Sequence, residues 1–206
     1  MNKYRIAVFA SGEGTNFQSL VDAAARDELG GASVELLICD KPAAPAVARA
    51  QKAGIACHTF RPKDYPARED YERELVALLE QKSIDLIVLA GYMRLLSSVM
   101  VDAYAGKIIN IHPSLLPAFP GKDAVGQALA YGVKVSGVTV HFVDGGMDTG
   151  AIIAQRVVEV HDHDTAESLS AAIQSVERQL YPEVVGRLAQ GKIQLNGRKV
   201  SSLLKR

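Results

Sequence analysis

Two polar side chains close an apolar run in the middle of the chain. Asn110 and His112 alternate with isoleucines in the segment that ends at Pro113. Residues two apart on a strand face the same side, so we expect these side chains to project together. Pro113 biases the residue before it toward an extended conformation and ends the ladder. Two polar groups on one face are costly to bury without partners, which favours a functional pair over two capped residues at a strand end.

Acyl transfer is a chemistry that this pair could perform. An amine that attacks a formyl carbon creates an oxyanion, to which an Asn amide and a protonated His can donate hydrogen bonds. A His near neutral pH can also move the proton from the attacking nitrogen to the leaving nitrogen. A carboxylate beside His112 would favour the protonated ring. Asp148 is the candidate, and spacing alone leaves Asp123 and Asp144 as alternatives.

A glycine-containing loop, residues 11–16, follows the first apolar run. Gly14 lets the backbone turn sharply and approach a ligand, and the free N–H groups of the next helix can hold a phosphate. Thr15 and Asn16 add side-chain donors. The loop matches neither the dinucleotide fingerprint nor the P-loop, although Asp40 is a possible ribose partner. We expect a site for a single phosphate, and the alternative is a helix cap with turn glycines.

Apolar runs alternate with segments of helical period through the first part of the chain. We expect strands at 4–10, 34–39, 56–60, 84–90 and 107–112, and helices at 17–26, 44–53 and 68–82. Near-continuous apolar strands separated by helices are typical of a parallel sheet covered on both faces. The sequence therefore predicts an α/β fold with a doubly wound, mainly parallel twisted sheet. Polar groups at a strand's carboxyl end in such a sheet, such as Asn110 and His112, point into the ligand crevice.

The pattern changes after about residue 135. Two strand-like runs, 135–143 and 151–160, flank a segment rich in Gly and Asp, 144–150, which predicts an antiparallel strand in the C-terminal part. A long helix is expected at about 165–188. A small hairpin is expected to turn at Asn196 and Gly197.

The composition is that of an ordinary globular protein. Hydrophobic residues make up 48% of the 206 residues and charged residues 22%. We find no linker, repeat or low-complexity stretch, so we expect one domain over 1–206. Its core would span about 4–190, followed by a C-terminal hairpin and tail at 191–206.

Charge and hydropathy narrow the function classes. The 23 basic and 23 acidic side chains give no net charge, which argues against nucleic acid as a partner. No apolar stretch approaches the roughly 20 residues of a membrane span, and the first residues lack a signal-peptide pattern. We expect a cytoplasmic protein that binds small molecules but no nucleic acid or membrane, as a monomer or homodimer.

No metal site is expected. Cys39 and Cys57 lie in apolar surroundings and are interpreted as small buried residues. The segment His161 to Asp164 has two histidines and two aspartates but no identifiable third element of a site. We interpret it as an exposed turn in which Asp164 caps the following helix.

The run Asn-Ile-His-Pro-Ser-Leu-Leu-Pro at 110–117 resembles the signature of the folate-dependent formyltransferase family, and the resemblance spans roughly residues 4–190. It includes segments 11–16, 89–94, 141–143 and 147–150. The first loop and segment 177–182 restrict the resemblance to those members of the family that formylate glycinamide ribonucleotide. Segment 122–126 departs from members that carry histidines there, so its substrate contacts are left unassigned.

The resemblance implies transfer of the formyl group of 10-formyltetrahydrofolate, as co-substrate and without metal, to the amine of glycinamide ribonucleotide in de novo purine biosynthesis. The residues at the family's catalytic positions are Asn110, His112 and Asp148. Those that match substrate contacts are Gly14, Thr15, Asn16 and Glu177. Those that match the folate pocket are Arg68, Met93, Arg94, Leu95, Leu96 and Asn110.

Three alternatives are weaker. A methionyl-tRNA formyltransferase would share the catalytic run but would need additional sequence for tRNA. A formyltetrahydrofolate hydrolase would use water as acceptor, would need no phosphate loop, and usually carries an added N-terminal domain. A nucleotide-binding module without catalysis would have no need of Asn110, His112 and Asp148 together.

Overall fold

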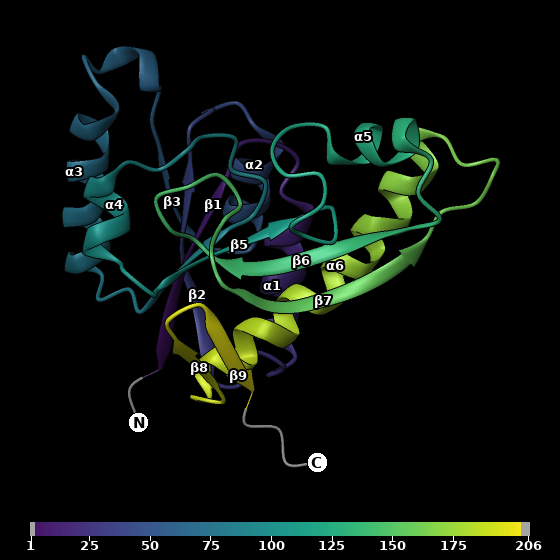
Figure 1. The fold of residues 1–206 in the computed structure, drawn as a ribbon. Helices are drawn as coiled ribbons and strands as arrows, with labels where there is room; N and C mark the ends of the chain where they lie inside the picture. The colour runs from purple at the N-terminus through teal and green to yellow at the C-terminus, as the bar shows by residue number, and fades with distance from the viewer. Residues whose placement is uncertain (1–2, 203–206) are drawn as a thin grey trace.

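The computed structural model describes residues 3–202 and has a seven-stranded sheet at its centre (Figure 1). Across the sheet, the strands are β3 (Ala56–Thr59), β2 (Ala32–Cys39), β1 (Tyr4–Ala10), β4 (Leu86–Leu89), β5 (Ile108–His112), β6 (Val135–Phe142) and β7 (Ile152–Glu159). Pairing is parallel from β3 to β5, whereas β6 is antiparallel to both of its neighbours. The predicted fold class is confirmed. The end of the predicted tail, 203–206, lies outside the described residues.

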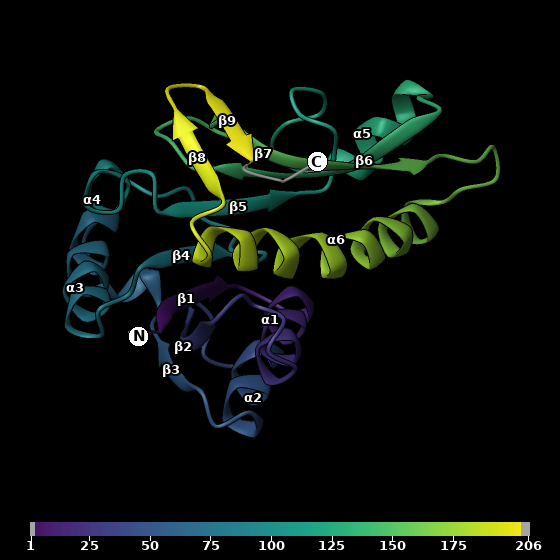
Figure 2. The same ribbon diagram turned by 90° about the horizontal axis from the view of Figure 1, so that it is seen from below.

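Helices cover both faces of the sheet (Figure 2). One face carries α1 (Thr15–Ala25), α2 (Pro45–Lys52) and α6 (Ala166–Ala189), and the other carries α3 (Arg68–Gln81) and α4 (Ser98–Ala103). The remaining elements are α5 (Ala124–Tyr131), which packs against α6, a short 3₁₀ helix (Pro62–Asp64), and a hairpin of β8 (Ile193–Asn196) and β9 (Lys199–Ser202). None of the helices within 3–202 is long and apolar enough to cross a membrane.

Strand β1 shows why the strands are apolar on both sides. Ile6 and Val8 are fully buried against the helices of one face, and Ala7 and Phe9 are fully buried against those of the other. A strand between two helical layers has no solvent-facing side, so its sequence is a continuous apolar run rather than an alternating one.

The start of α6 differs from the prediction. Thr165, not Asp164, is the N-cap: its side chain accepts from the Ser168 amide, and the Ser168 hydroxyl accepts from the Thr165 amide. Asp164 lies one residue too early for this role. Its carboxylate instead accepts hydrogen bonds from the His161 amide and the Ser168 hydroxyl, which closes the preceding turn.

The C-terminal hairpin turns one residue later than predicted. Asn196 pairs with Lys199, so Gly197 and Arg198 form the two-residue loop. Gly197 has a φ of 60°, and glycine at the first position of such a loop suits the twist of the flanking strands. Arg198 therefore sits at the tip of the hairpin.

Two short helices and one burial state were not predicted correctly. Helices α4 and α5 were not predicted from the sequence, and α4, with six residues, is too short for periodicity to separate it from a loop. Cys39 is buried as expected, but Cys57 is only partly buried, because β3 is an edge strand with one side open.

Candidate active site

The end of β5 places Asn110 and His112 beside a second histidine. Asn110 lies opposite His141 in the antiparallel ladder between β5 and β6. Residues directly opposite on such strands share a face and lie within side-chain reach. The Asn110 Nδ2 atom is 3.4 Å from His141 Nε2. Residue spacing does not predict this contact, because it depends on the register of two strands; His141 stands in the family resemblance, but without an assigned role.

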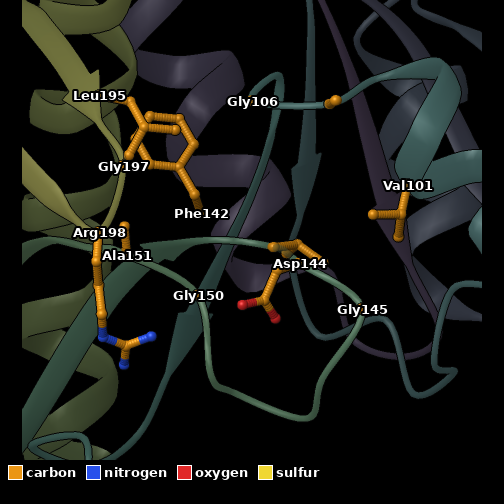
Figure 3. A pocket seen from close by; sticks show the side chains of 12 residues that line it. Val101, Gly106, Phe142, Asp144, Gly145, Gly150, Ala151, Leu195, Gly197 and Arg198 are labelled. Atoms are coloured by element: carbon orange, nitrogen blue, oxygen red, sulfur yellow. The ribbon is translucent and has the colours of Figure 1, made fainter.

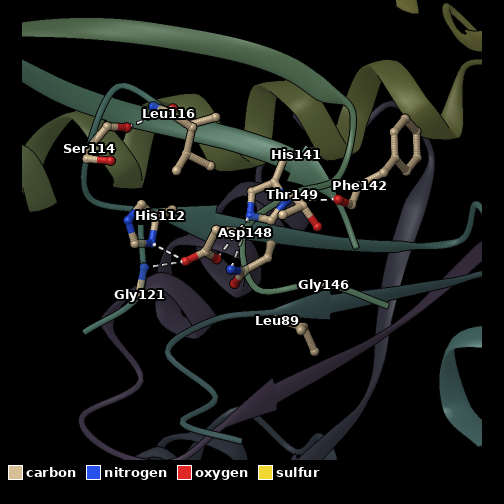
Figure 4. Close-up of polar contacts among 12 residues, drawn as sticks. Leu89, His112, Ser114, Leu116, Gly121, His141, Phe142, Gly146, Asp148 and Thr149 are labelled. Atoms are coloured by element: carbon tan, nitrogen blue, oxygen red, sulfur yellow. Dashed lines mark hydrogen bonds and ion pairs between the residues drawn. The ribbon is translucent and has the colours of Figure 1, made fainter. Parts of the chain in front are cut away.

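His112 is 5% exposed and has partners at both ring nitrogens. Its Nε2 lies 2.8 Å from the Phe119 carbonyl oxygen. A carbonyl can only accept, so this nitrogen carries a proton. Its Nδ1 lies 3.4 Å from Asp148 Oδ2 (Figure 4). The His112 ring therefore lies between the Phe119 carbonyl and the Asp148 carboxylate.

The structure separates Asp148 from its two alternatives. Asp123 caps α5 by accepting from the Gly126 amide. Asp144 accepts hydrogen bonds from the Thr149 hydroxyl and the Gly146 amide. Among the three, Asp148 is therefore the carboxylate that lies against His112.

The Gly121 amide holds the Asp148 carboxylate in place. It donates a hydrogen bond of 2.8 Å to Asp148 Oδ2, and Asp148 Oδ1 lies 3.6 Å from His141 Nε2, beyond hydrogen-bond distance. Figure 4 shows the carboxylate between the rings of His112 and His141. The segment after β5 is itself fixed, because the Leu116 amide donates to the Thr139 hydroxyl on β6. These bonds bring the loop carrying Phe119 and Gly121 to the histidine and the carboxylate.

His141 is held in its neutral form. Burial lowers its pKa, against the opposing effects of a hydrogen bond to the Phe142 carbonyl and the charge of Asp148. Its Nδ1 donates to the Phe142 carbonyl oxygen at 2.8 Å, so the neutral ring has its lone pair on Nε2. That lone pair can accept one N–H of the Asn110 amide, which leaves the second N–H of Asn110 available to a ligand.

The first loop leaves the start of α1 without a side-chain cap. Gly14 is the N-cap of α1 and has a φ of 71°. A Cβ atom there would lie 2.7 Å from the Ala46 Cβ. Because Gly14 has no side chain to cap the helix, the first N–H groups of α1 stay open to an anion. The predicted phosphate loop is thus a helix start in which glycine is required by both backbone conformation and close packing.

Asn16 and Glu177 meet although they are 161 positions apart in the chain. Asn16 Nδ2 donates to Glu177 Oε2 at 2.9 Å. Burial raises the pKa of Glu177, and the hydrogen bond from Asn16 lowers it in part. Asn16 Oδ1 is buried and has no hydrogen-bond partner within residues 3–202. An orphaned acceptor beside a buried carboxyl group is costly unless a ligand supplies donors.

Of the expected folate-pocket residues, Met93 to Leu96 follow β4 next to the first loop, Arg68 begins α3, and Asn110 lies on β5. The Met93 amide donates to the Ser11 hydroxyl at 3.0 Å. Arg68 donates to the Leu95 carbonyl oxygen, and the Arg94 guanidinium pairs with the buried Asp40 at 2.6 Å.

Their exposure differs along the segment. Met93 is 76% exposed and Leu95 is 55% exposed, whereas Leu96 packs on the core. Met93 and Leu95 are therefore not part of the core. Exposed apolar side chains close together can form a binding surface.

The segment His161–Asp164 is an exposed turn in which the rings of His161 and His163 stack at 5.7 Å. Within residues 3–202, no group of three or more His, Cys, Asp or Glu side chains is placed to hold a metal ion.

Similarity to known proteins agrees with this geometry. Residues 4–185 match the formyl transferase family. The phosphoribosylglycinamide formyltransferase of Bacillus subtilis is 50% identical over 184 residues, which are 89% of this chain and 94% of that protein.

Solved structures show the same fold. The glycinamide ribonucleotide transformylase 1 of Symbiobacterium toebii superposes with a TM-score of 0.94 at 42% identity, over 97% of this chain and 94% of that one. A formyltetrahydrofolate deformylase of Pseudomonas syringae pv. tomato superposes with a TM-score of 0.90 at 28% identity, over 98% of this chain and 66% of that one. The resemblance expected from the sequence is confirmed: the chain is an enzyme of the formyl transferase family.

Proposed function

We propose that the protein transfers the formyl group of 10-formyltetrahydrofolate to the amine of glycinamide ribonucleotide in de novo purine biosynthesis. The observation that carries the proposal is the His112–Asp148 pair, 3.4 Å apart and beside Asn110, at the carboxyl end of β5. The 50% identical relative from Bacillus subtilis bears the name of this activity.

Asn110 and His112 stabilise the oxygen of the group being transferred. The donor supplies a formyl carbon that the substrate amine attacks directly, and negative charge develops on the formyl oxygen. The free N–H of the Asn110 amide and the Nε2–H of His112 donate to that oxygen. In the structure the Phe119 carbonyl accepts from His112 Nε2, so the reacting oxygen has to replace this carbonyl as acceptor.

Asp148 orients His112. Its carboxylate faces His112 Nδ1 at 3.4 Å, and in this orientation the ring presents Nε2 to the oxygen of the transferred group. His112 can also give a proton to the leaving nitrogen and take one from the attacking amine.

The loop before α1 and the buried Glu177 hold the ribonucleotide. The first-turn N–H groups of α1, with Gly14, Thr15 and Asn16, face the phosphate and ribose. The orphaned Asn16 Oδ1 supports this role, because it is a buried acceptor in need of a donor. Glu177 lies beside it and accepts from a substrate N–H or O–H group.

The segment after β4 holds the folate. Met93, Leu95 and Leu96 supply apolar contacts to the flat pterin and its linker, as the exposure of the first two allows. Arg68 supplies positive charge toward the donor's carboxylates, and Arg94, which is paired with Asp40, lines the same segment. We propose that the enzyme acts in the cytoplasm on these small molecules, as a monomer or homodimer.

Hydrolysis of the same donor is the second candidate, because the deformylase of Pseudomonas syringae pv. tomato shares the fold. An absorbance assay of purified protein with 10-formyltetrahydrofolate, with and without glycinamide ribonucleotide, separates the two. Transferase activity predicts folate product only when the ribonucleotide is present. Equal turnover without it would establish the hydrolase, and no turnover in either case would exclude both. A gel-filtration run with light scattering on the same sample gives the oligomeric state.

A further inference from the structure

The C-terminal hairpin lies next to the loop that carries Asp148, residues 144–150. Its strands, β8 and β9, lie beyond the matched residues 4–185. Ile193 and Val200 dock the hairpin on the core. A cavity of about 350 Å³ separates the hairpin from the 144–150 loop, with Asp144 on the loop side and Arg198 on the hairpin side (Figure 3).

Arg198 bridges the cavity to the residue after Asp148. Its Nη1 donates to the Thr149 carbonyl oxygen at 2.8 Å. The Thr149 hydroxyl in turn donates to Asp144 Oδ1 at 2.6 Å. Thr149 is therefore held at its backbone by the hairpin and at its side chain by the loop.

Asp148 needs such support because its backbone is strained. Its φ is 55°, in the left-handed region that residues other than glycine rarely adopt. Residues keep such conformations only when their surroundings enforce them. The anchored Thr149 fixes the chain on one side of Asp148, and the Gly121 amide fixes its carboxylate.

The charge of Arg198 also supports the loop through Asp144. Burial raises the pKa of Asp144, but hydrogen bonds from Thr149 and Gly146 and the charge of Arg198 lower it overall. Asp144 therefore stays ionised and accepts both loop hydrogen bonds near neutral pH. This second link is independent of the bond between Arg198 and the Thr149 carbonyl.

We propose that Arg198, from the hairpin outside the matched domain, is a positioning residue for Asp148: by holding Thr149 it keeps the Asp148 carboxylate against His112. The catalytic part of this inference rests on the proposed function. Its structural part does not, because the position of Asp148 can be measured without substrate.

The Gly121 amide reports on that position, since its hydrogen bond ends on Asp148 Oδ2. Amide hydrogen exchange by NMR should show Gly121 exchanging about fivefold faster in Arg198→Ala than in the unaltered protein. Lys199→Ala, the neighbouring cation of the hairpin, is the matched control and should leave Gly121 unchanged. Equal protection of Gly121 in the Arg198→Ala variant would overturn the proposal. If that variant fails to fold, Arg198→Gln carries the same comparison.

Kinetics then link the position to turnover. Arg198→Ala should lower kcat about fivefold to tenfold, with KM for the ribonucleotide within about twofold, because a small misplacement of a catalytic group costs rate rather than binding. Arg198→Lys should restore part of the loss, since its ammonium can donate to the same carbonyl.

A double-mutant cycle excludes a merely structural effect. In an Asp148→Asn background, Arg198→Ala should change kcat less than about twofold, because residues that act through one another are not additive. Full additivity would overturn the link to Asp148. If the unaltered protein shows no ribonucleotide-dependent turnover, the proposed function fails, and the Gly121 exchange alone decides whether Arg198 positions Asp148.

Discussion

At the level of single residues, the site depends on a histidine that orients an amide. His141 accepts from Asn110 across two strands and is itself fixed by the Phe142 carbonyl. An Asn side chain can rotate and exchange its oxygen for its nitrogen. A neutral acceptor at Nε2 selects the orientation in which the Asn110 amide nitrogen, and not its oxygen, faces the ring. The second N–H is then directed by the same contact.

Removal of this acceptor should reduce turnover while the fold is kept. In His141→Phe the ring volume is retained but Asn110 loses its partner, so kcat should fall about tenfold through misplacement of one oxyanion donor. His58→Phe, at a partly buried histidine of β3, is the control and should keep its kcat. Steady-state rates at saturating substrates measure both, and an unchanged rate in His141→Phe would show that Asn110 needs no such support.

At the level of elements, the site lies where strand ends and helix starts meet. Strand β5 supplies Asn110 and His112, α1 begins at the glycine loop, and α6 supplies Glu177. The close approach of Gly14 to Ala46 fixes the start of α1 against α2. Helix α1 can offer its N–H groups to a phosphate only while the loop keeps this geometry.

A methyl group at Gly14 should disturb this junction. Gly14→Ala meets both a left-handed backbone and the Ala46 Cβ, whereas Gly54→Ala meets a similar φ of 68° with nothing within 4 Å. The left-handed backbone alone costs about 1–2 kcal/mol. Urea unfolding should therefore show a larger loss of stability for Gly14→Ala than for Gly54→Ala. Calorimetry should show weaker binding of the ribonucleotide in Gly14→Ala but not in Gly54→Ala. Equal losses of stability and of binding in the two variants would show that the contact with Ala46 does not matter.

At the level of the whole molecule, residues far apart in the sequence form one site. The buried titratable groups of this site make the free energy of unfolding depend on pH. Helix α6 contacts α1, β2, β6 and β7, so it joins the early and late parts of the sheet. We propose that residues 1–206 unfold as one unit. His141 has its pKa lowered by burial and Glu177 has its pKa raised by burial, so folding changes the protonation of both.

The sign for His141 follows from proton binding. Its ordinary pKa is 6.5 and its pKa in the folded chain is lower, so below pH 6.5 the unfolded chain binds a proton that the folded chain does not. This contribution to stability is present above pH 6.5 and is lost as the pH falls toward the folded pKa. Glu177 has the opposite sign: its contribution is lost as the pH rises from 4.5 through its raised pKa.

Urea unfolding at pH 7.5 and at pH 5.5 tests this linkage. Circular dichroism should show a single transition at each pH, and the unaltered protein should lose more stability on acidification than His141→Phe does. An equal loss in the two proteins would mean that His141 does not take up a proton on unfolding. Two separate transitions would contradict the single folding unit.

The sequence predicts the sheet, most of its helices and the candidate catalytic trio, but not how the trio is supported. The strands of the parallel part are continuous apolar runs, which local pattern reveals. The choice of Asp148 over Asp123 and Asp144 needed the contact of the 144–150 loop with His112, and the contact of His141 with Asn110 needed the register of β5 on β6. The contact of Arg198 with Thr149 depended on the position of the hairpin turn, which lies one residue later than the sequence predicts. Each of these contacts is set by tertiary structure, on which local pattern carries no information.

The most direct test of the central claim is the single-turnover rate of formyl transfer to glycinamide ribonucleotide by Asn110→Ala. We expect a loss of at least about 100-fold, as for removal of an oxyanion donor, with the circular dichroism spectrum unchanged. Asn196→Ala, on the hairpin, is the matched control and should keep the full rate. A rate for a folded Asn110→Ala equal to that of the unaltered protein would contradict the claim that the end of β5 is the catalytic centre.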